Sequence, residues 1–276
     1  MDHSSHAYWL GGAGLPFVMI AYLIFLAAPV VLLGLGSFGE TWSNTLLPNG
    51  FTTRWFVEVA RDPSFRRAFA TSLQIAALTC ALNVLIGLPL AYAIQAGARG
   101  GLRVAARLVT FLPIAVPELV QAFGFILIFS SDALPWLGSF GLLAAAHLIL
   151  TLPYTVTALI ADMDQLGLDD YEHAAATLGA SFVARFRDIT LPMLGTSLLS
   201  STLTVAALSI GEFQLSNLVS GFLSRTYPVV LLQAFYGATG FACAATIILL
   251  TLAIIASLAS SVTAQVAGAH KGQAAA

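Results

Sequence analysis

The sequence has 276 residues, of which 58% are hydrophobic and only 9% are charged, with a formal net charge of −2. Soluble globular domains carry about 25% charged residues, so a surface with so few charges must face lipid rather than water. The chain has no basic patch of the kind that binds nucleic acid, which excludes that class of partner.

Apolar stretches recur along the chain at the length that a membrane-spanning helix requires, about 20 residues. They predict an all-α membrane protein, a single transmembrane domain over residues 1–276 with about six transmembrane helices. The predicted spans cover residues 15–38, 68–96, 108–130, 133–161, 189–216 and 241–266. Pro113, Pro117 and Glu118 interrupt the third of them. Residues 227–266 carry no charge, and Gly237 and Gly240 favour a break there, with residues 219–240 as a loop or a re-entrant segment.

The basic residues give the orientation of these spans. With both termini inside, the inner and outer loops hold similar numbers of basic residues, so the overall count does not decide. One short loop nevertheless concentrates Arg99, Arg103 and Arg107, which favours its side as cytoplasmic. The loop between the fourth and fifth spans, residues 162–190, then lies on the same side.

That loop holds a compact charged segment with helical periodicity. Gly179 divides it, so we expect two short amphipathic helices at the membrane surface. Asp169 and Glu172 have the spacing of a capping box. The predicted apolar face consists of Leu168, Tyr171, Ala175, Leu178, Phe182, Phe186 and Ile189. Periodicity leaves two interpretations open: an interfacial helix that anchors a loop, or a helix that docks into a groove on a soluble partner.

The residue identities favour the docking interpretation. Ala174, Ala175, Gly179, Ile189 and the pair Leu191-Pro192 follow the spacing A-A-x-x-x-G-x9-I-x-L-P. This resembles the EAA loop of the inner-membrane permease subunits of type I ABC importers, the binding-protein-dependent transporters. Weaker resemblance covers GLPLAYAI at 87–94, LPIAVPELV at 112–120 and SIGEF at 209–213. The SIGEF stretch is similar to permeases for polyamines, iron, thiamine or phosphonates.

The resemblance implies a transport subunit of the bacterial inner membrane, not an enzyme. Its loop would be a coupling helix that docks on a dimer of ATP-binding subunits, and a second permease subunit and a periplasmic substrate-binding protein would complete the importer. The chain contains no G-x-x-x-x-G-K-[ST] motif, so ATP and Mg²⁺ would bind the partner ATPase. The implied coupling residues are Glu172, His173, Ala174, Ala175, Gly179, Ile189, Leu191 and Pro192.

One position departs from the family pattern. The glutamate of the family stands six residues before the glycine, where this chain has His173, and the acid is Glu172. A shift of one residue turns a side chain by about 100° around a helix. Two alternatives stay open: Glu172 reaches the same groups by another path, or the ion pair is absent and His173 supplies a hydrogen bond or a pH-dependent charge.

Charged residues within spans are costly and are candidates for function. Glu118 is expected near the middle of the third span, and Glu212 near the outer end of the fifth. Two acids on one route suggest a cationic substrate such as a polyamine, although Glu212 as a helix cap and Glu118 as a partner of another helix remain alternatives. His147 is expected to be a hydrogen-bonded interior histidine. The sequence shows no metal-site spacing and no catalytic constellation.

Other functions and substrates remain open at this stage. An ATP-independent secondary transporter or channel is the alternative class, and the EAA-like loop argues against it. A phosphonate, sulfate or iron compound is the alternative to a cationic substrate, because the binding protein largely selects the solute. The sequence does not distinguish a homodimer from a heterodimer of permeases.

Overall fold

The computed structural model of the protein describes residues 14–42, 45, 47–97 and 100–254. The chain divides into two compact units. The central unit is Pro63–Val230, and the terminal unit combines the described parts of Met1–Asp62 and Leu231–Ala276. Within the described residues the regular structure is helical, as predicted for an all-α membrane protein.

The terminal unit contains α1 (Gly14–Phe38), α2 (Arg54–Arg61) and an apolar helix over Thr239–Ile254. The α1 helix matches the first predicted span, and the side chains along most of its length are exposed, as expected for a helix whose neighbours are lipid or another chain. Trp55 fixes the turn after α1, because its Nε1 donates to the carbonyl of Gly39 at 2.8 Å.

The central unit is a row of long helices with short helices at their ends. In chain order its helices are α3 (Pro63–Leu82), the π-helical segment η1 (Asn83–Gly87), α4 (Leu88–Tyr92), the π-helical segment η2 (Ala93–Gly97), α5 (Gly101–Ala115), α6 (Glu118–Phe129), α7 (Phe140–Leu166), α8 (Leu168–Thr177), α9 (Phe182–Arg185), the π-helical segment η3 (Phe186–Thr190), α10 (Leu191–Met193), α11 (Gly195–Gly211) and α12 (Gln214–Val219). A further helix, α13 (Tyr227–Phe235), begins in this unit and ends in the terminal one.

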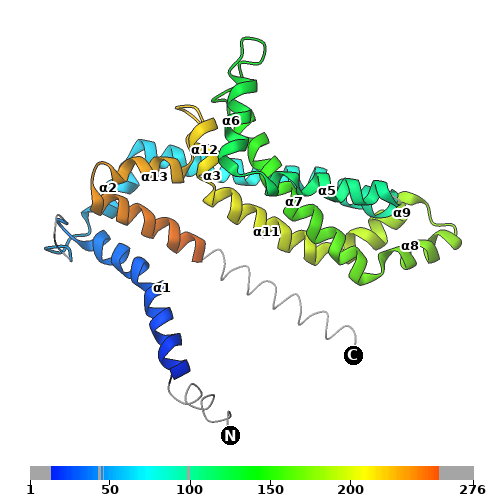
Figure 1. Ribbon diagram of the computed structural model, residues 1–276, viewed down its shortest axis with the longest axis horizontal. Helices are drawn as coiled ribbons and strands as arrows, with labels where there is room; N and C mark the ends of the chain where they lie inside the picture. The colour runs from blue at the N-terminus through cyan, green and yellow to red at the C-terminus, as the bar shows by residue number, and fades with distance from the viewer. Residues whose placement is uncertain (1–13, 43–44, 46, 98–99, 255–276) are drawn as a thin grey trace, which may run out of the picture. The chain divides into compact units, whose positions relative to one another are not determined.

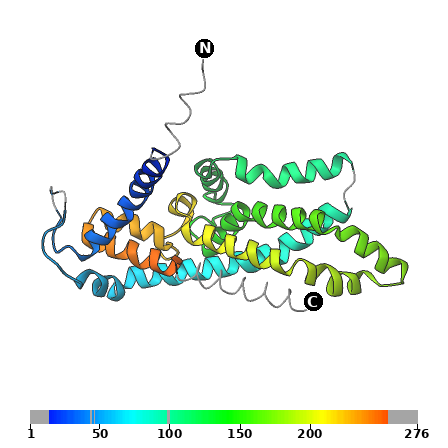
Figure 2. The same cartoon turned by 90° about the horizontal axis from the view of Figure 1, so that it is seen from below.

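The helices α3, α7 and α11 run side by side at the centre of this unit (Figures 1 and 2). Small residues on α7, such as Ala144 and Ala146, are buried and allow close helix packing. Buried polar groups join the helices as well. The Asn83 side-chain amide donates to Thr151 Oγ1 at 2.8 Å, and Thr155 donates to Asn83 Oδ1 at 3.0 Å. Such contacts satisfy polar groups where water is absent.

Two of the predicted spans are broken. The span predicted at 108–130 consists of α5 and α6, which meet at an angle of 94°. The span predicted at 189–216 lies on Phe182–Met193 and α11, which meet at 64°. The first break falls at Val116–Pro117, where proline lacks a backbone N–H and disfavours helix in the residue before it. Each of these two predicted spans is therefore a bent pair of helices, which passes the test for a membrane span when the pair is taken together.

By length and composition, the described residues contain three helices able to cross a membrane, or up to five candidates if each bent pair is one span. The second predicted span extends to Pro63–Gly97, and the fourth is α7, which begins at Phe140 rather than 133. The sixth begins within Thr239–Ile254, and its remainder, 255–266, lies outside the described residues. Gly237 does mark a helix break, but residues 219–240 include α13.

Two loops of the central unit meet at a pair of glycines. Gly138, before α7, forms a backbone bridge with Ser220, and Ser224 Oγ donates to the Gly138 carbonyl at 3.0 Å. A Cβ on Gly221 would lie 2.4 Å from the Gly138 carbonyl oxygen. The backbones therefore approach more closely than any side chain allows.

Candidate functional site

The central unit contains a cavity that brings the two predicted pathway acids together. Its volume is about 370 Å³. Glu118 from the start of α6 and Glu212 from the end of α11 both line it, together with Leu150 and Tyr154 of α7 and Gln214 of α12. The cavity lies at the end of α11 away from α8 and α9, about 25 Å along that helix at 1.5 Å per residue.

Glu118 is the first residue of α6, directly after the break at Pro117. Its side chain is half-buried and makes no hydrogen bond or ion pair with any residue that the structure describes. The position of Glu118 near the middle of the third span stays a prediction, and the structure adds that the chain turns directly before it, at Pro117. The break nevertheless places this carboxylate at the cavity wall.

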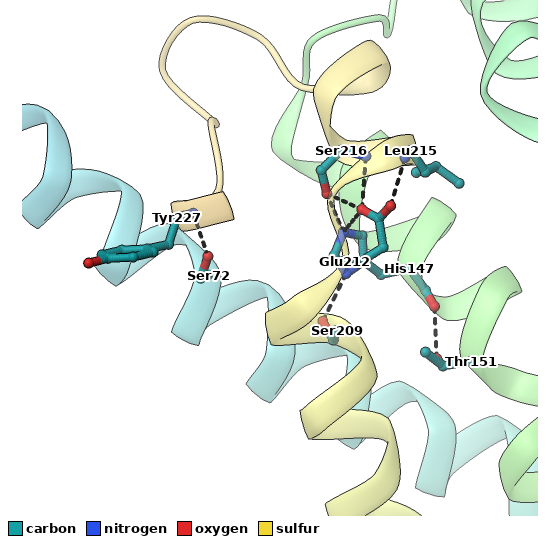
Figure 3. Close-up of polar contacts among 8 residues, drawn as sticks. All are labelled: Ser72, His147, Thr151, Ser209, Glu212, Leu215, Ser216 and Tyr227. Carbon is teal, nitrogen blue, oxygen red and sulfur yellow. Dashed lines mark hydrogen bonds and ion pairs between the residues drawn. The ribbon is translucent and has the colours of Figure 1, made fainter. Parts of the chain in front are cut away.

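Glu212 has a different environment, because its carboxylate binds the start of α12 (Figure 3). The backbone N–H groups of Leu215 and Ser216 donate to its two oxygens at 2.6 and 2.8 Å, and the Ser216 hydroxyl donates to Oε2 as well. Only 5% of the residue is exposed. An acid suits this place because the first N–H groups of a helix have no partner within the helix. Glu212 is therefore a cap, but of α12 rather than of its own span.

His147 packs against this cap from α7 and is completely buried. Its Nδ1 is 2.8 Å from Ser209 Oγ, its Nε2 is 2.9 Å from Ser216 Oγ, and Nε2 lies 3.5 Å from Glu212 Oε2 (Figure 3). The expectation of a hydrogen-bonded interior histidine is confirmed. Sequence reasoning missed its partners. The available signal was the serines that flank Glu212 in a stretch that is otherwise apolar.

The predicted coupling segment, residues 168–192 and called the coupling segment below, lies at the other end of α7 and α11. Its α8 ends at Thr177, and Gly179, two residues later, has a φ of +85°. The N–H of Gly179 bonds the carbonyl of Ala176, and the N–H of Ala180 bonds that of Ala175, both at 3.0 Å. These two bonds form a Schellman motif, which needs a residue that tolerates positive φ. A Cβ on Gly179 would meet nothing within 4 Å in this chain, so the positive φ, and not a close approach of the chain's own backbone, favours glycine here.

Most of the predicted coupling residues lie at the surface. His173, Ala174, Gly179, Leu191 and Pro192 are exposed, whereas Ala175 and Ile189 are half-buried. The predicted apolar face is only partly buried, because the turn at Gly179 interrupts the helix. Large apolar side chains stay exposed there, with exposed fractions of 88% for Leu178, 67% for Val183, 57% for Tyr171 and 53% for Phe182.

Glu172 is the predicted coupling residue that turns inward. Only 6% of it is exposed, and its carboxylate accepts hydrogen bonds from Tyr92 and Thr190. The expected capping box was wrong: α8 begins after Gly167, and no side chain caps it. Glu172 is unavailable for that role because its oxygens bind hydroxyls on other elements.

The basic loop lies near the same end. Arg107 bonds Asp164 at 3.1 Å and Gln95 Oε1 at 3.1 Å, and Arg103 donates to the Gln95 carbonyl at 2.7 Å. Arg99 lies outside the described residues. Over residues 14–42, 45, 47–97 and 100–254, no group of three or more His, Cys, Asp or Glu side chains is placed to hold a metal ion.

Comparison with known proteins decides the family. The model of the binding-protein-dependent transport system inner membrane component matches residues 83–265. The chain belongs to this family. It is a permease component of an ABC importer and an inner-membrane protein. The match covers Glu118, Glu212, His147 and the whole coupling segment.

The permease resembles relatives whose names differ in substrate. It is 27% identical over 214 residues to the putative 2-aminoethylphosphonate permease PhnV of Salmonella typhimurium, covering 77% of this chain and 78% of that protein. It is 27% identical over 222 residues to the putrescine permease PotI of Escherichia coli, covering 79% and 78%. It is 26% identical over 272 residues to the sulfate permease CysW of Synechocystis, covering 92% and 95%.

The fold of the permease also resembles solved importers. A chain of a bacterial ABC transporter that imports the acidic polysaccharide alginate aligns over 96% of this chain and 99% of its own, with a TM-score of 0.68 at 13% identity. This agreement in fold supports the predicted architecture. The three named relatives span a phosphonate, a polyamine and sulfate, so the family alone does not fix the solute.

Proposed function

We propose that this permease forms part of the translocation path for a small solute that carries an ammonium group, and that Glu118 contacts that group. The observation that carries the proposal is the unpaired carboxylate of Glu118 on the wall of a cavity of about 370 Å³. A carboxylate in such a place attracts cations, and an ionisable residue at membrane depth is a candidate for the path.

Glu212 contributes differently in this proposal. Its two oxygens are already occupied by the N–H groups of α12, so it shapes the cavity wall and does not bind the solute directly. Putrescine and 2-aminoethylphosphonate, named for two of the relatives, both contain a primary ammonium group. Sulfate, named for the third, has none and would be repelled by Glu118.

We further propose that the coupling segment docks on a dimer of ATP-binding subunits, which hold ATP and Mg²⁺ and perform the hydrolysis. The exposed Tyr171, Leu178, Phe182 and Val183 support this role, because water-exposed apolar side chains in a cluster mark an interaction surface. His173, Ala174, Gly179, Leu191 and Pro192 lie on the same accessible segment. A second permease and a periplasmic binding protein complete the importer.

The test is uptake by the complex of this chain with its ATPase and binding protein in proteoliposomes. Radiolabelled putrescine, 2-aminoethylphosphonate and sulfate are compared, with and without ATP inside. We expect ATP-dependent uptake of an ammonium-bearing solute, and about tenfold slower uptake in Glu118→Gln. Sulfate uptake that is unchanged in Glu118→Gln would contradict the proposal.

Asp132→Asn is the matched control for this substitution. Asp132 is an exposed acid in the loop after α6 that does not line the cavity, so its loss changes the net charge by the same amount. We expect uptake within twofold of the unchanged protein. Equal losses in both variants would assign the effect to overall charge rather than to the cavity.

A further inference from the structure

Glu172 joins three elements that are far apart in the sequence. It stands on α8, within the coupling segment, and only 6% of it is exposed. The Tyr92 hydroxyl, at the end of α4, donates to its Oε2 at 2.6 Å. The Thr190 hydroxyl, at the end of η3, donates to its Oε1. Each carboxylate oxygen therefore has a hydroxyl donor within this chain. We call the contacts among Tyr92, Glu172 and Thr190 the Glu172 joint.

The tyrosine of this joint is itself held in place. Its ring packs edge-on against Phe182 at 5.8 Å and against Phe186 at 5.6 Å between ring centroids. These two phenylalanines, from α9 and η3, also lie against one another at 6.1 Å. Such aromatic pairs fix orientation as well as burying area. The second half of the coupling segment therefore encloses the Tyr92 ring and directs its hydroxyl to the first half.

An apolar contact supports the same joint one helical turn away. Leu168 lies four residues before Glu172, so the two side chains share one face of α8. Leu168 is 2% exposed and belongs to a buried cluster with Leu88 and Ala91 of α4, Met163 of α7 and Leu194. The inward face of α8 is thus committed to the spans of its own chain, through both apolar packing and hydrogen bonds.

The neighbouring position faces the opposite way. His173 is exposed, and no hydrogen bond or ion pair connects it to any other residue that the structure describes. A charged carboxylate that leaves two hydroxyl donors would strand them, which costs more than the hydrogen bonds contribute when made. Glu172 is therefore a poor group to offer to a partner, whereas the His173 side chain is accessible without any rearrangement.

We propose that Glu172 is a positioning residue that fastens the coupling segment to the span Pro63–Gly97 and to the start of α10, and that it does not contact the ATPase. Movement of the docked segment then passes through the carboxylate to Tyr92 and Thr190. His173 occupies the outward position that meets the ATPase. This inference rests on the proposed docking of an ATPase on residues 168–192.

The test measures whether the coupling segment stays attached to the span. The complex with its ATPase is placed in lipid nanodiscs with spin labels at Leu85→Cys on η1 and Ala176→Cys on α8, both exposed positions, after Cys80→Ser and Cys243→Ser. Double electron–electron resonance gives the distance distribution with and without ATP and vanadate. Size exclusion gives the amount of ATPase retained.

We expect Tyr92→Phe, Thr190→Val and Glu172→Gln to retain the ATPase at the original stoichiometry. Each should raise the population of a second, displaced distance about fivefold, as loss of one hydrogen bond worth about 1 kcal/mol implies. Tyr236→Phe, which removes an exposed hydroxyl outside residues 168–192, is the matched control and should leave the distribution unchanged. His173→Ala should reduce ATPase retention and leave the distribution unchanged.

Other outcomes overturn the inference. Loss of the ATPase in Glu172→Gln, with the distance distribution intact, would place Glu172 at the ATPase surface. Unchanged distributions in both Tyr92→Phe and Thr190→Val would show that the joint transmits nothing. Failure of the unchanged protein to retain any ATPase would instead refute the proposed docking, which separates the two failures.

Discussion

The buried carboxylates of Glu172 and Glu212 in the central unit both accept hydrogen bonds, but from different kinds of donor. Glu212 binds N–H groups three and four residues further along its own chain, so it closes a local turn between α11 and α12. Glu172 binds hydroxyls on α4 and η3, so it connects separate elements. The first arrangement stabilises a cavity wall, and the second attaches α8 to α4 and η3, as the proposed link between the coupling segment and the spans requires.

This comparison predicts that removal of Glu212 has the largest effect on stability. In Glu212→Ala the N–H groups of Leu215 and Ser216 lose their acceptor, and the buried His147 loses a neighbouring carboxylate. Each buried group left unsatisfied costs about 1–3 kcal/mol, so we expect about 3 kcal/mol in total. The measurement is the melting temperature of the purified protein in detergent, followed by fluorescence size exclusion.

Glu212→Gln keeps one carbonyl acceptor and should recover part of this loss. Glu118→Gln should leave the melting temperature unchanged, because Glu118 has no partner among the residues that the structure describes. A similar fall in melting temperature in Glu118→Gln and Glu212→Ala would contradict the assignment of Glu118 to the path and of Glu212 to a helix cap.

The next largest effect is expected at the turn of the coupling segment. Gly179→Val places a β-branched residue at a φ of +85°, and left-handed backbone costs about 1–2 kcal/mol in residues with a Cβ. We expect lower substrate-stimulated ATP hydrolysis, with normal amounts of protein in the membrane. ATPase assays and immunoblots of the same membranes measure the two quantities.

Gly179→Asn is the control at this position, because asparagine tolerates the left-handed region better than valine. It should retain most of the stimulated hydrolysis. Gly179→Asp adds a charge to the exposed face in the same backbone conformation, and we expect it to impair docking more than membrane insertion. Unchanged substrate-stimulated ATP hydrolysis in Gly179→Val would show that coupling does not require the Schellman turn.

The smallest effect on stability is expected at His173. The side chain is exposed and makes no hydrogen bond or ion pair with a described residue, so His173→Ala should change the free energy of unfolding by less than about 0.5 kcal/mol. The affinity of the His173→Ala permease for the ATPase should nevertheless fall several-fold. Thermal melts and titration of the ATPase subunit onto immobilised permease separate the two effects, and a large loss of stability would contradict its outward position.

The sequence predicted the existence of the helices better than their continuity. Runs of apolar residues located α1, α3 and α7, because lipid requires such runs. The prolines at 113 and 117 indicated a disturbed third span, but local pattern cannot give the 94° angle between α5 and α6, which tertiary packing sets. The sequence placed Glu118 near mid-span, but it did not show that this residue starts a helix at the wall of a cavity.

The candidate residues show the same limit at smaller scale. The spacing around Gly179 predicted the turn that ends α8, because positive φ favours glycine. Periodicity could not decide whether Glu172 or His173 faces inward, since they are adjacent and their partners lie elsewhere. Tyr92 stands 80 residues before Glu172, and only the folded chain brings the two together.

The contact between Gly138 and Gly221 has a consequence for how this protein can change over generations. A Cβ on Gly221 would lie 2.4 Å from the Gly138 carbonyl oxygen, and Gly138 has a φ of +82° and would bring a Cβ to 3.2 Å from the Gly221 Cα. Ser224 bonds the two loops at that separation. A new residue at one position would need the opposite loop to be rebuilt at the same time. We therefore expect both positions to stay glycine in descendants of this sequence, because a side chain at one is not relieved by a side chain at the other.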